Sequence, residues 1–443
     1  MSTKIYPIGI QNFEKIRNDG YFYIDKTELM YQMVKTGSYY FLSRPRRFGK
    51  SLLISTLEAY FQGKKELFEG LAVEKLEKDW IKHPILHLDL NIEKYDTPES
   101  LDKILNDNLE YWESQYGTRP SETSFSLRFA GIIQRACEKT GQRVVILVDE
   151  YDKPMLQAIG NEELQKQFRN TLKPFYGALK TKDGYIKFAL LTGVTKFGKV
   201  SVFSDLNNLD DISMWNEYVE ICGVSEREIH ENLEAELHEF AAARGITYDK
   251  LCEDLRECYD GYHFTHNSIG MYNPFSLLNA FKRKEFGSYW FETGTPTYLV
   301  KLLKKHHYDL ERMAHEETDV QVLNSIDSES TNPIPVIYQS GYLTIKGYDE
   351  EFGMYRLGFP NREVEEGFIR FLLPFYANVN KVESPFEIQK FVREVRSGDY
   401  NSFFRRLQSF FADTTYEVIR DQELHYENVL FIVFKLLGFY TKV

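Results

Sequence analysis

The chain has 443 residues, of which 43% are hydrophobic and 15% aromatic, a composition that supplies packed cores and excludes an intrinsically disordered protein. Its net charge of −12 at pH 7 repels nucleic acid on average and argues against broad, nonspecific coating of DNA. No apolar stretch is long enough to span a bilayer, and the N-terminal segment lacks the apolar core of a signal peptide, so we expect a cytoplasmic protein that does not contact a membrane.

Residues 1–36 are expected to form a lead-in to the first strand. Asp25 lies three residues before Glu28, which is the spacing of a capping box and predicts a helix that begins here and runs through 29–34. The apolar run 39–42 then predicts a buried strand.

The segment 43–52, with the sequence SRPRRFGKSL, lies between this strand and a stretch whose apolar residues recur with helical spacing. Strand, loop and helix in this order are the context of a phosphate-binding loop. Such a loop needs backbone N–H groups around the β- and γ-phosphates, a lysine that neutralises them, and a hydroxyl that ligates Mg²⁺ at a helix N-terminus. Gly49, Lys50 and Ser51 supply the last three positions of G-x-x-x-x-G-K-[ST].

The first glycine of this consensus is missing, because Arg44 occupies its position and Pro45 follows. The motif alone therefore leaves open a basic turn that happens to contain Gly-Lys-Ser. The basic side chains of the segment are better explained by a triphosphate than by a nucleic-acid duplex. We predict that the nucleotide is bound by Arg44, Pro45, Arg46, Arg47, Phe48, Gly49, Lys50, Ser51 and Leu52.

A second motif ends the run 144–148, five apolar residues of which four are β-branched, as expected for a central parallel strand. Asp149 at its carboxyl end is predicted to hold Mg²⁺ together with Ser51. Glu150 is predicted to orient and deprotonate the water that attacks the γ-phosphate. A strand that ends in a polar turn is the alternative, but both motifs together, in this order, favour a nucleotide-binding enzyme.

A third strand is predicted at 185–191, and we expect it between the two strands that carry the motifs. Thr192 or Thr195 at its end could sense the γ-phosphate, although a Thr-Gly turn explains either residue equally well. Of the two, Thr192 joins Lys50 and Glu150 in the predicted catalytic set. A further strand at 84–90 and helices at 99–116, 124–139 and 161–180 alternate with these strands, which predicts a parallel α/β core.

Several segments together resemble the bacterial AAA-like ATPase family that is often fused to a PD-(D/E)XK nuclease domain. The resemblance rests first on RPRRFGKSL, VVILVDEYDKP and LLTGVTKFGKVS. It extends over nearly the whole chain, through 7–13, 23–27, 259–262, 272–276, 289–294 and 338–345. In that family an arginine in place of the first P-loop glycine is usual.

The resemblance implies an additional-strand P-loop NTPase core that takes ATP or ADP and Mg²⁺. It also leaves open that the Asp-Lys-Thr segment 25–27 lies near the nucleotide, besides capping a helix. No residue in the sequence marks ATP over GTP, and Arg143, Arg169 and Arg227 are all conceivable arginine fingers.

After about residue 215 the pattern becomes mostly helical, and we expect a helical lid or adaptor. Ser225 and Glu228 again have capping-box spacing. The four cysteines form no C-x-x-C pair and no zinc pattern with nearby histidines, so we expect free, mostly buried thiols.

A helix at 332–340 followed by a hairpin within 341–359 has the order of a winged helix. The stretch between Arg312 and Lys346 contains no lysine or arginine. Because DNA reading needs cations that anchor phosphates, we prefer a structural winged helix over a DNA reader.

Near the end of the chain, a helix is predicted from Gln422 to Leu437, with Gly438 as its C′ residue and a new strand from Phe439. In relatives that carry the nuclease, such a helix and strand open the nuclease fold, and the metal-binding acids lie further along. We therefore expect no nuclease activity here and a chain shortened relative to theirs.

The predicted domains are an ATPase core at 1–214, a helical lid at 215–318, a winged-helix-like region at 319–378 and the start of an incomplete nuclease-type domain at 379–443. Two functions remain open. The first is a Mg²⁺-dependent ATPase that drives or gates an unknown protein effector, and the second is a nucleotide-gated switch or scaffold with negligible turnover. DNA is expected as a partner only through the nuclease domain.

Overall fold

The computed structural model describes residues 4–196, 202–203, 206–293, 297–324, 332–377, 384–412 and 422–440. Its largest sheet has the strand order β2-β3-β4-β1-β5, and neighbouring strands run parallel. The strands are β1 (Tyr39–Ser43), β2 (Ile85–Asp89), β3 (Val144–Asp149), β4 (Ile186–Gly193) and β5 (Asp210–Asp211). The position of β4 between β1 and β3 confirms the predicted order, and it brings the carboxyl ends of these strands to one edge.

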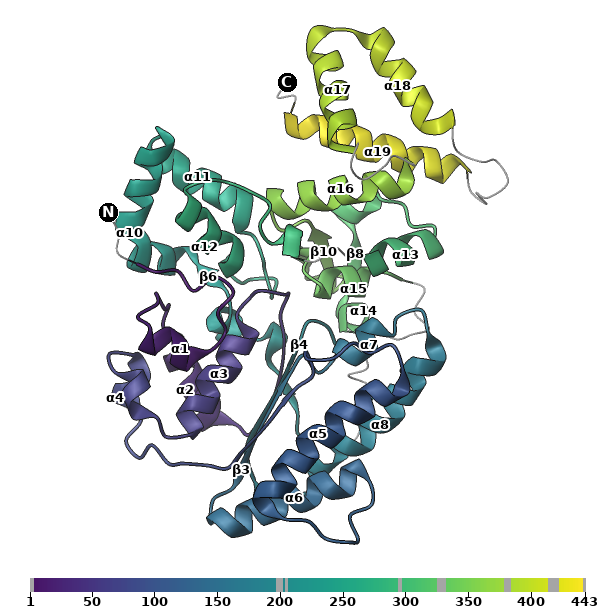
Figure 1. Ribbon diagram of the computed structural model, residues 1–443. Coiled ribbons are helices and arrows are strands. Elements are labelled where there is room, and N and C mark those ends of the chain that lie inside the picture. The colour runs from purple at the N-terminus through teal and green to yellow at the C-terminus, as the bar shows by residue number, and fades with distance from the viewer. Residues whose placement is uncertain are drawn as a thin grey trace.

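Helices cover both faces of this sheet, which explains why all of β3 is buried. Figure 1 shows α2 and α3 on one side of the sheet and α5, α6 and α8 on the other. The helices predicted at 99–116, 124–139 and 161–180 are confirmed to within a residue. The helices are α1 (Phe13–Asn18), α2 (Thr27–Thr36), α3 (Lys50–Phe61), α4 (Ala72–Leu76), α5 (Pro98–Tyr116), α6 (Phe125–Thr140), α7 (Lys153–Gln157) and α8 (Glu162–Thr181), with short 3₁₀ turns η1 (Lys65–Phe68), η2 (Asp183–Tyr185), η3 (Ile212–Met214) and η4 (Asn216–Ile221).

The capping box predicted for Asp25 and Glu28 does not form. Lys26 is the N-cap of α2, and its side chain makes no capping bond. Asp25 instead accepts hydrogen bonds from the backbone N–H and the hydroxyl of Thr27, at 2.8 and 2.7 Å, and from the backbone N–H of Ala72 at 2.7 Å. The carboxylate therefore joins the start of α2 to α4, a contact across 47 residues that local spacing cannot reveal.

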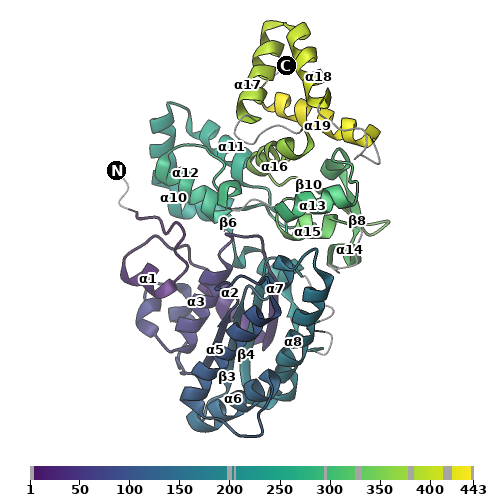
Figure 2. The same cartoon turned by 45° about the vertical axis from the view of Figure 1, so that its right-hand side comes forward.

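A helical unit with its own apolar core follows the sheet, and both views place it above α1 and α3 (Figures 1 and 2). The hydroxyl of Ser225 accepts the backbone N–H of Glu228, whose carboxylate accepts the N–H of Ser225, so the second predicted capping box is confirmed. The unit consists of α10 (Glu226–Arg244), α11 (Tyr248–Tyr259), α12 (Pro274–Arg283) and the two-stranded ladder of β6 (Val224–Ser225) and β7 (Met271–Tyr272).

A mixed unit lies next along the chain. The helix predicted near 332–340 is α15, and the hairpin that follows it is formed by β9 and β10, with β8 pairing antiparallel to β10. The elements are η5 (Phe291–Thr293), α13 (Thr297–Lys305), η6 (Arg312–His315), β8 (Glu317–Asp319), α14 (Val320–Asn324), α15 (Ile334–Gln339), β9 (Thr344–Asp349) and β10 (Met354–Gly358).

Four helices end the described chain: α16 (Arg362–Tyr376), α17 (Ser384–Ser397), α18 (Tyr400–Ala412) and α19 (Gln422–Tyr440). The prediction that Gly438 stops the last helix and that Phe439 begins a strand is wrong, because α19 continues to Tyr440. The hydroxyl of Tyr440 bonds to Glu366 on α16, and its backbone oxygen accepts from Arg396 on α17. These tertiary contacts hold a last turn that the glycine alone would end; residues 441–443 lie outside the described part.

The burial of the cysteines and the apolar character of the helices bear on two further expectations. All four cysteines are free, Cys222 is buried and Cys137, Cys252 and Cys258 are partly buried, so the expectation of free thiols that are mostly buried is confirmed. Among the described helices, none combines the length and the apolar character needed to cross a bilayer.

Candidate active site

The loop between β1 and α3 is held at the carboxyl edge of the sheet. The backbone N–H of Arg44 donates to the carbonyl of Gly193 on β4 at 3.2 Å. Gly49, the N-cap of α3, has φ 99°, a left-handed conformation that favours glycine. The backbone of Arg44 is not left-handed, so the position that is glycine in the consensus needs no glycine here. The first N–H groups of α3 face the end of this loop, as an anion site requires.

The side chain of Arg44 points into the protein. The residue is only 1% exposed, and its guanidinium donates to the carbonyl oxygens of Ser43, Ser213 and Tyr218 at 3.0, 2.8 and 3.1 Å. It also lies 3.9 Å from the centre of the Phe264 ring. Burial lowers the pKa of Arg44 to about 10, so the group is still charged at neutral pH. Arg44 therefore ties the loop to η3, η4 and the segment that follows α11.

Lys50 and Glu150 bring the two motifs together. The Lys50 Nζ donates to the carbonyl oxygens of Arg44 and Pro45 at 3.0 and 3.3 Å, and it lies 3.6 Å from the Glu150 Oε1. Glu150 adopts φ 54°, a strained conformation for a residue other than glycine. The chain leaves β3 at Glu150, and in this conformation the Glu150 carboxylate approaches the Lys50 ammonium.

Asp149 is held by the neighbouring strand. Its Oδ1 accepts hydrogen bonds from the Thr192 hydroxyl at 2.7 Å and from the backbone N–H of Glu150 at 3.1 Å. Ser51, the second residue of α3, lines the adjacent cleft. A hydroxyl and a carboxylate are the oxygen donors that Mg²⁺ prefers, so the residues present fit this ion. Thr192 contacts the predicted metal ligand, and its hydroxyl is committed to that contact.

Thr195 contacts a carboxylate that the sequence analysis did not single out. Asp152 is fully buried and accepts from the backbone N–H and the hydroxyl of Thr195, both at 2.6 Å, and from the N–H of Val194 at 3.2 Å. Burial and the nearby charge of Glu150 raise the pKa of Asp152 to about 6. Asp152 thus fixes the end of β4 against β3. Its place in the Asp-Glu-Tyr-Asp run was the only signal that could have found it.

A polar cleft of about 520 Å³ lies over the start of α3. The loop supplies one wall through Arg46, Arg47, Gly49, Lys50, Ser51 and Leu52. The rest of the lining comes from six separate segments, namely Pro7 to Gln11, Asn91, the stretch that holds Glu150 and Lys153, Val194, the stretch that holds Pro274 and Leu278, and Thr293. Its size and its concentration of cations suit a phosphate-bearing ligand.

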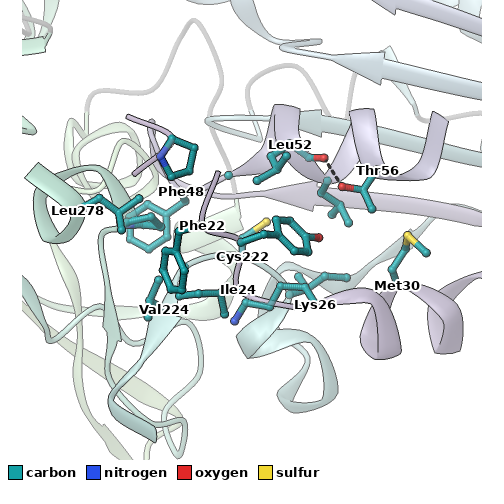
Figure 3. A pocket seen from close by; sticks show the side chains of 17 residues that line it. Phe22, Ile24, Lys26, Met30, Phe48, Leu52, Thr56, Cys222, Val224 and Leu278 are labelled. Carbon is teal, nitrogen blue, oxygen red and sulfur yellow. Dashed lines mark hydrogen bonds between the residues drawn. The ribbon is translucent and has the colours of Figure 1, made fainter. Parts of the chain in front are cut away.

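An apolar cavity of about 110 Å³ adjoins this cleft and shares Pro7, Gly49, Leu52, Pro274 and Leu278 with it. Figure 3 shows the side chains of Phe22, Ile24, Phe48, Val224 and Leu278 gathered around it, with Thr56 and Met30 further along. Lys26 is in the same wall, so one residue of the Asp-Lys-Thr segment does lie beside this cavity. The cavity is lined by residues that precede β1, by the loop and α3, by residues 221–224, and by α12 of the helical unit.

The loop also makes direct contacts with the later units of the chain. The carbonyl of Phe48 accepts the N–H of Gly223 at 3.0 Å, and its ring lies 4.8 Å from that of Tyr262. The carbonyl of Arg46 accepts the indole N–H of Trp290 at 3.0 Å. Tyr262 and Trp290 lie in the segments 259–262 and 289–294 that carry the family resemblance, but the sequence does not predict that they contact the loop, because each contact depends on a tertiary arrangement.

Two comparisons relate the chain to known proteins, and the first agrees with a nucleotide site. The model of the AAA-ATPase_like family, described as a predicted AAA-ATPase, matches residues 7–203. A protein of Azotobacter chroococcum mcd 1, named as an uncharacterized protein in the vnfD 5′ region, is 35% identical over 452 residues, which cover 99% of this chain and 84% of that protein. The chain belongs to the AAA-ATPase-like family.

In this AAA-ATPase-like protein, the matched residues contain β1, β2, β3 and β4 and the charged residues of the cleft, Arg46, Arg47, Lys50, Glu150 and Lys153. The apolar cavity needs Ile221 to Val224 and Pro274 to Leu278 as well. Those segments lie outside the family model and inside the length shared with the Azotobacter protein.

Proposed function

We propose that this protein binds MgATP at the loop 43–52 and hydrolyses it to ADP and phosphate. The proposal depends chiefly on the 3.6 Å approach of the Lys50 Nζ to the Glu150 Oε1 at the carboxyl edge of a parallel sheet. A phosphate-binding lysine and a general base are both needed beside the γ-phosphate, so the proximity of these two side chains supports the proposal. Membership of a family of predicted AAA-ATPases supports the same activity.

The nucleotide would span the two adjoining spaces. Its phosphates would lie in the polar cleft against the first N–H groups of α3, and its base in the apolar cavity beyond Leu52. Aromatic and aliphatic walls such as those of Phe22, Phe48 and Leu278 suit a flat base. The choice of ATP over GTP rests on the family.

In the proposed reaction, Glu150 takes a proton from the attacking water as the water oxygen bonds to the γ-phosphorus. The bond from this phosphorus to the bridging oxygen breaks, and its electron pair leaves with ADP. Lys50 stabilises the negative charge on the phosphates, and Thr192 keeps Asp149 in place. Mg²⁺, held by Ser51 and Asp149, would supply further neutralisation of the β- and γ-phosphates.

A nucleotide-gated switch is the second candidate, and the contacts of Arg46 and Phe48 with Trp290, Gly223 and Tyr262 favour it. A ligand that shifts the loop would alter these contacts and thereby bias the later units. Under either proposal, α10 to α12 would act as the lid. The unit of α15, β9 and β10 would be a structural winged helix that relays the change to an effector.

The deciding experiment measures phosphate release from MgATP, with nucleotide binding on the same samples, for the wild type, Lys50→Ala and Glu150→Gln. Loss of turnover in both variants, with binding retained in Glu150→Gln, would support the ATPase. Binding without turnover in the wild type would favour the switch, and an absence of binding would refute both.

A further inference from the structure

Lys153 is the first residue of α7, three residues beyond the proposed general base, and it lines the polar cleft together with Lys50, Ser51 and Glu150. Its ammonium donates to the backbone oxygen and to the side-chain Oδ1 of Asn91, both at 2.6 Å. Asn91 follows β2 and lines the same cleft. The side chain, which extends from α7, is therefore held in a definite position by the segment that follows β2.

The charge of Lys153 is not neutralised by these partners, since both oxygens of Asn91 are uncharged. Within the described residues, no carboxylate forms an ion pair with Lys153, whereas Lys50 has Glu150 at 3.6 Å. Burial lowers the pKa of Lys153, and nearby Arg46 adds to this effect, while the charges of Glu150 and Asp89 oppose it. A half-buried ammonium with neutral acceptors is prepared to receive an anion.

We propose that Lys153 binds the γ-phosphate of ATP in this cleft and acts as a second catalytic cation, on the side of the γ-phosphate that faces away from Lys50. The inference rests on the proposed function, because it names a further residue of the same site. It supplies from within the chain a positive charge of the kind that an arginine finger supplies in other P-loop enzymes.

The chemistry assigns each group one task. As water attacks, its proton passes to Glu150, the new P–O bond forms, and the bond to the bridging oxygen breaks with its electron pair leaving on ADP. Negative charge is then spread over the three equatorial oxygens of the transferred group. Lys50 neutralises the side shared with the β-phosphate, and Lys153 neutralises the side next to the attacking water. Lys153 therefore acts on ATP and on the transition state, and has no partner in bound ADP.

The test compares Lys153→Ala, Lys153→Arg and the exposed control Lys166→Ala on α8. Turnover of MgATP is measured with MgADP affinity and the melting temperature of each variant. For Lys153→Ala we expect kcat to fall by about 30-fold or more while the MgADP affinity stays within about twofold of the wild type. Lys153→Arg keeps a cation and should recover part of the loss, and Lys166→Ala should resemble the wild type.

If the hydrogen bonds of Lys153 with Asn91 only stabilise the structure, the variants should behave differently. In that case Lys153→Ala would lower the melting temperature and weaken ADP and ATP alike, and Asn91→Ala would reproduce its loss of turnover; this result would overturn the inference. Unchanged turnover in Lys153→Ala would overturn it too, with the proposed ATPase intact. If the wild type binds nucleotide without turnover, the affinities of Lys153→Ala for ATP and ADP decide. A fall in the affinity for ATP alone supports the binding of the γ-phosphate by Lys153. Absence of nucleotide binding in the wild type would refute the proposed function itself.

Discussion

The polar cleft and the apolar cavity meet at Pro7, Gly49, Leu52, Pro274 and Leu278, yet the rest of their walls is built in different ways. The charged residues of the cleft come from short motifs that end neighbouring strands. The walls of the cavity come from the lead-in, from α3, from the segment before β6 and from α12. Phosphate binding is therefore set by local sequence at a sheet edge, whereas the space for a base exists only when the helical unit packs onto the sheet domain.

This difference implies that the two spaces can be disabled separately. Changes to motif residues should abolish chemistry without altering the cavity. Changes to residues of the helical unit that line only the cavity, such as Val224, should affect base binding and leave inorganic phosphates unaffected.

Asp149→Asn should have the largest effect, because it removes a charge that Mg²⁺ requires while the Thr192 contact can persist. We expect turnover to fall by about 10²–10³-fold, with most of the protein still folded. Phosphate release measured across a Mg²⁺ titration tests this, with the exposed Asp107→Asn on α5 as the control. Wild-type turnover in Asp149→Asn would remove this residue from the site.

Arg44→Gly restores the P-loop consensus and should nevertheless destabilise the protein. It leaves the buried carbonyls of Ser213 and Tyr218 without their donor and opens a space beside Phe264. We expect a loss of about 2–4 kcal/mol in the free energy of unfolding, measured by urea denaturation. Arg119→Gly, in an exposed loop, is the matched control. Equal stability of Arg44→Gly and the wild type would show that the buried guanidinium does not stabilise the loop.

Val224→Trp sharpens the comparison directly, since this side chain on β6 of the helical unit lines the apolar cavity and not the cleft, and an indole would fill the cavity. Affinity for MgATP should fall by about tenfold, or ~1.4 kcal/mol, while affinity for inorganic tripolyphosphate stays unchanged. Calorimetric titration of both ligands measures this, beside Leu127→Trp on the exposed face of α6. An equal loss for both ligands would contradict the division of the site.

A change at Glu363 should have the smallest effect, and it tests the contacts that Trp290 makes with Glu363 and with the loop 43–52. Its carboxylate accepts the N–H of Trp290 at 2.7 Å, and Trp290 in turn donates to the carbonyl of Arg46. Burial raises the pKa of Glu363 from 4.5 to about 7. The folded protein therefore holds this proton more tightly than the unfolded chain, and the resulting stabilisation, complete below about pH 4.5, is lost as the pH rises through about 7.

When the pH rises from 6 to 8, ionisation of Glu363 should lower the free energy of unfolding of the wild type by ~1 kcal/mol, measured by urea denaturation at both pH values. Glu363→Gln cannot titrate and should show a correspondingly smaller change. The exposed Glu69→Gln should follow the wild type. A pH dependence of Glu363→Gln equal to that of the wild type would rule out this source.

Local sequence was sufficient for the parallel sheet and for the convergence of Lys50 and Glu150. The run 144–148 is apolar on both faces, and such strands are buried in parallel sheets, so the positions of Asp149 and Glu150 at a carboxyl edge followed. The Ser225 capping box was also readable, because a capping box is a contact between residues three apart.

The same reasoning failed at Asp25 and at Gly438, where distant partners outweigh local preference. Asp25 has Ala72 as a partner, and the last turn of α19 is held by Glu366 and Arg396. Asp152 and Lys153 were not found, since their roles depend on Thr195 and Asn91, which follow other strands. The domain boundaries at 214, 318 and 378 stay predictions.

The sequence by itself determined the strand-loop-helix motif, the acidic end of β3 and the order of the central strands, since these depend on periodicity and on spacings within a few residues. Tertiary structure alone decided that Arg44 turns inward, that the apolar cavity adjoins the cleft, and that the loop contacts Trp290 and Tyr262. Those features arise where segments far apart in the chain exclude water from one another, and the free energy of that burial belongs to no single segment.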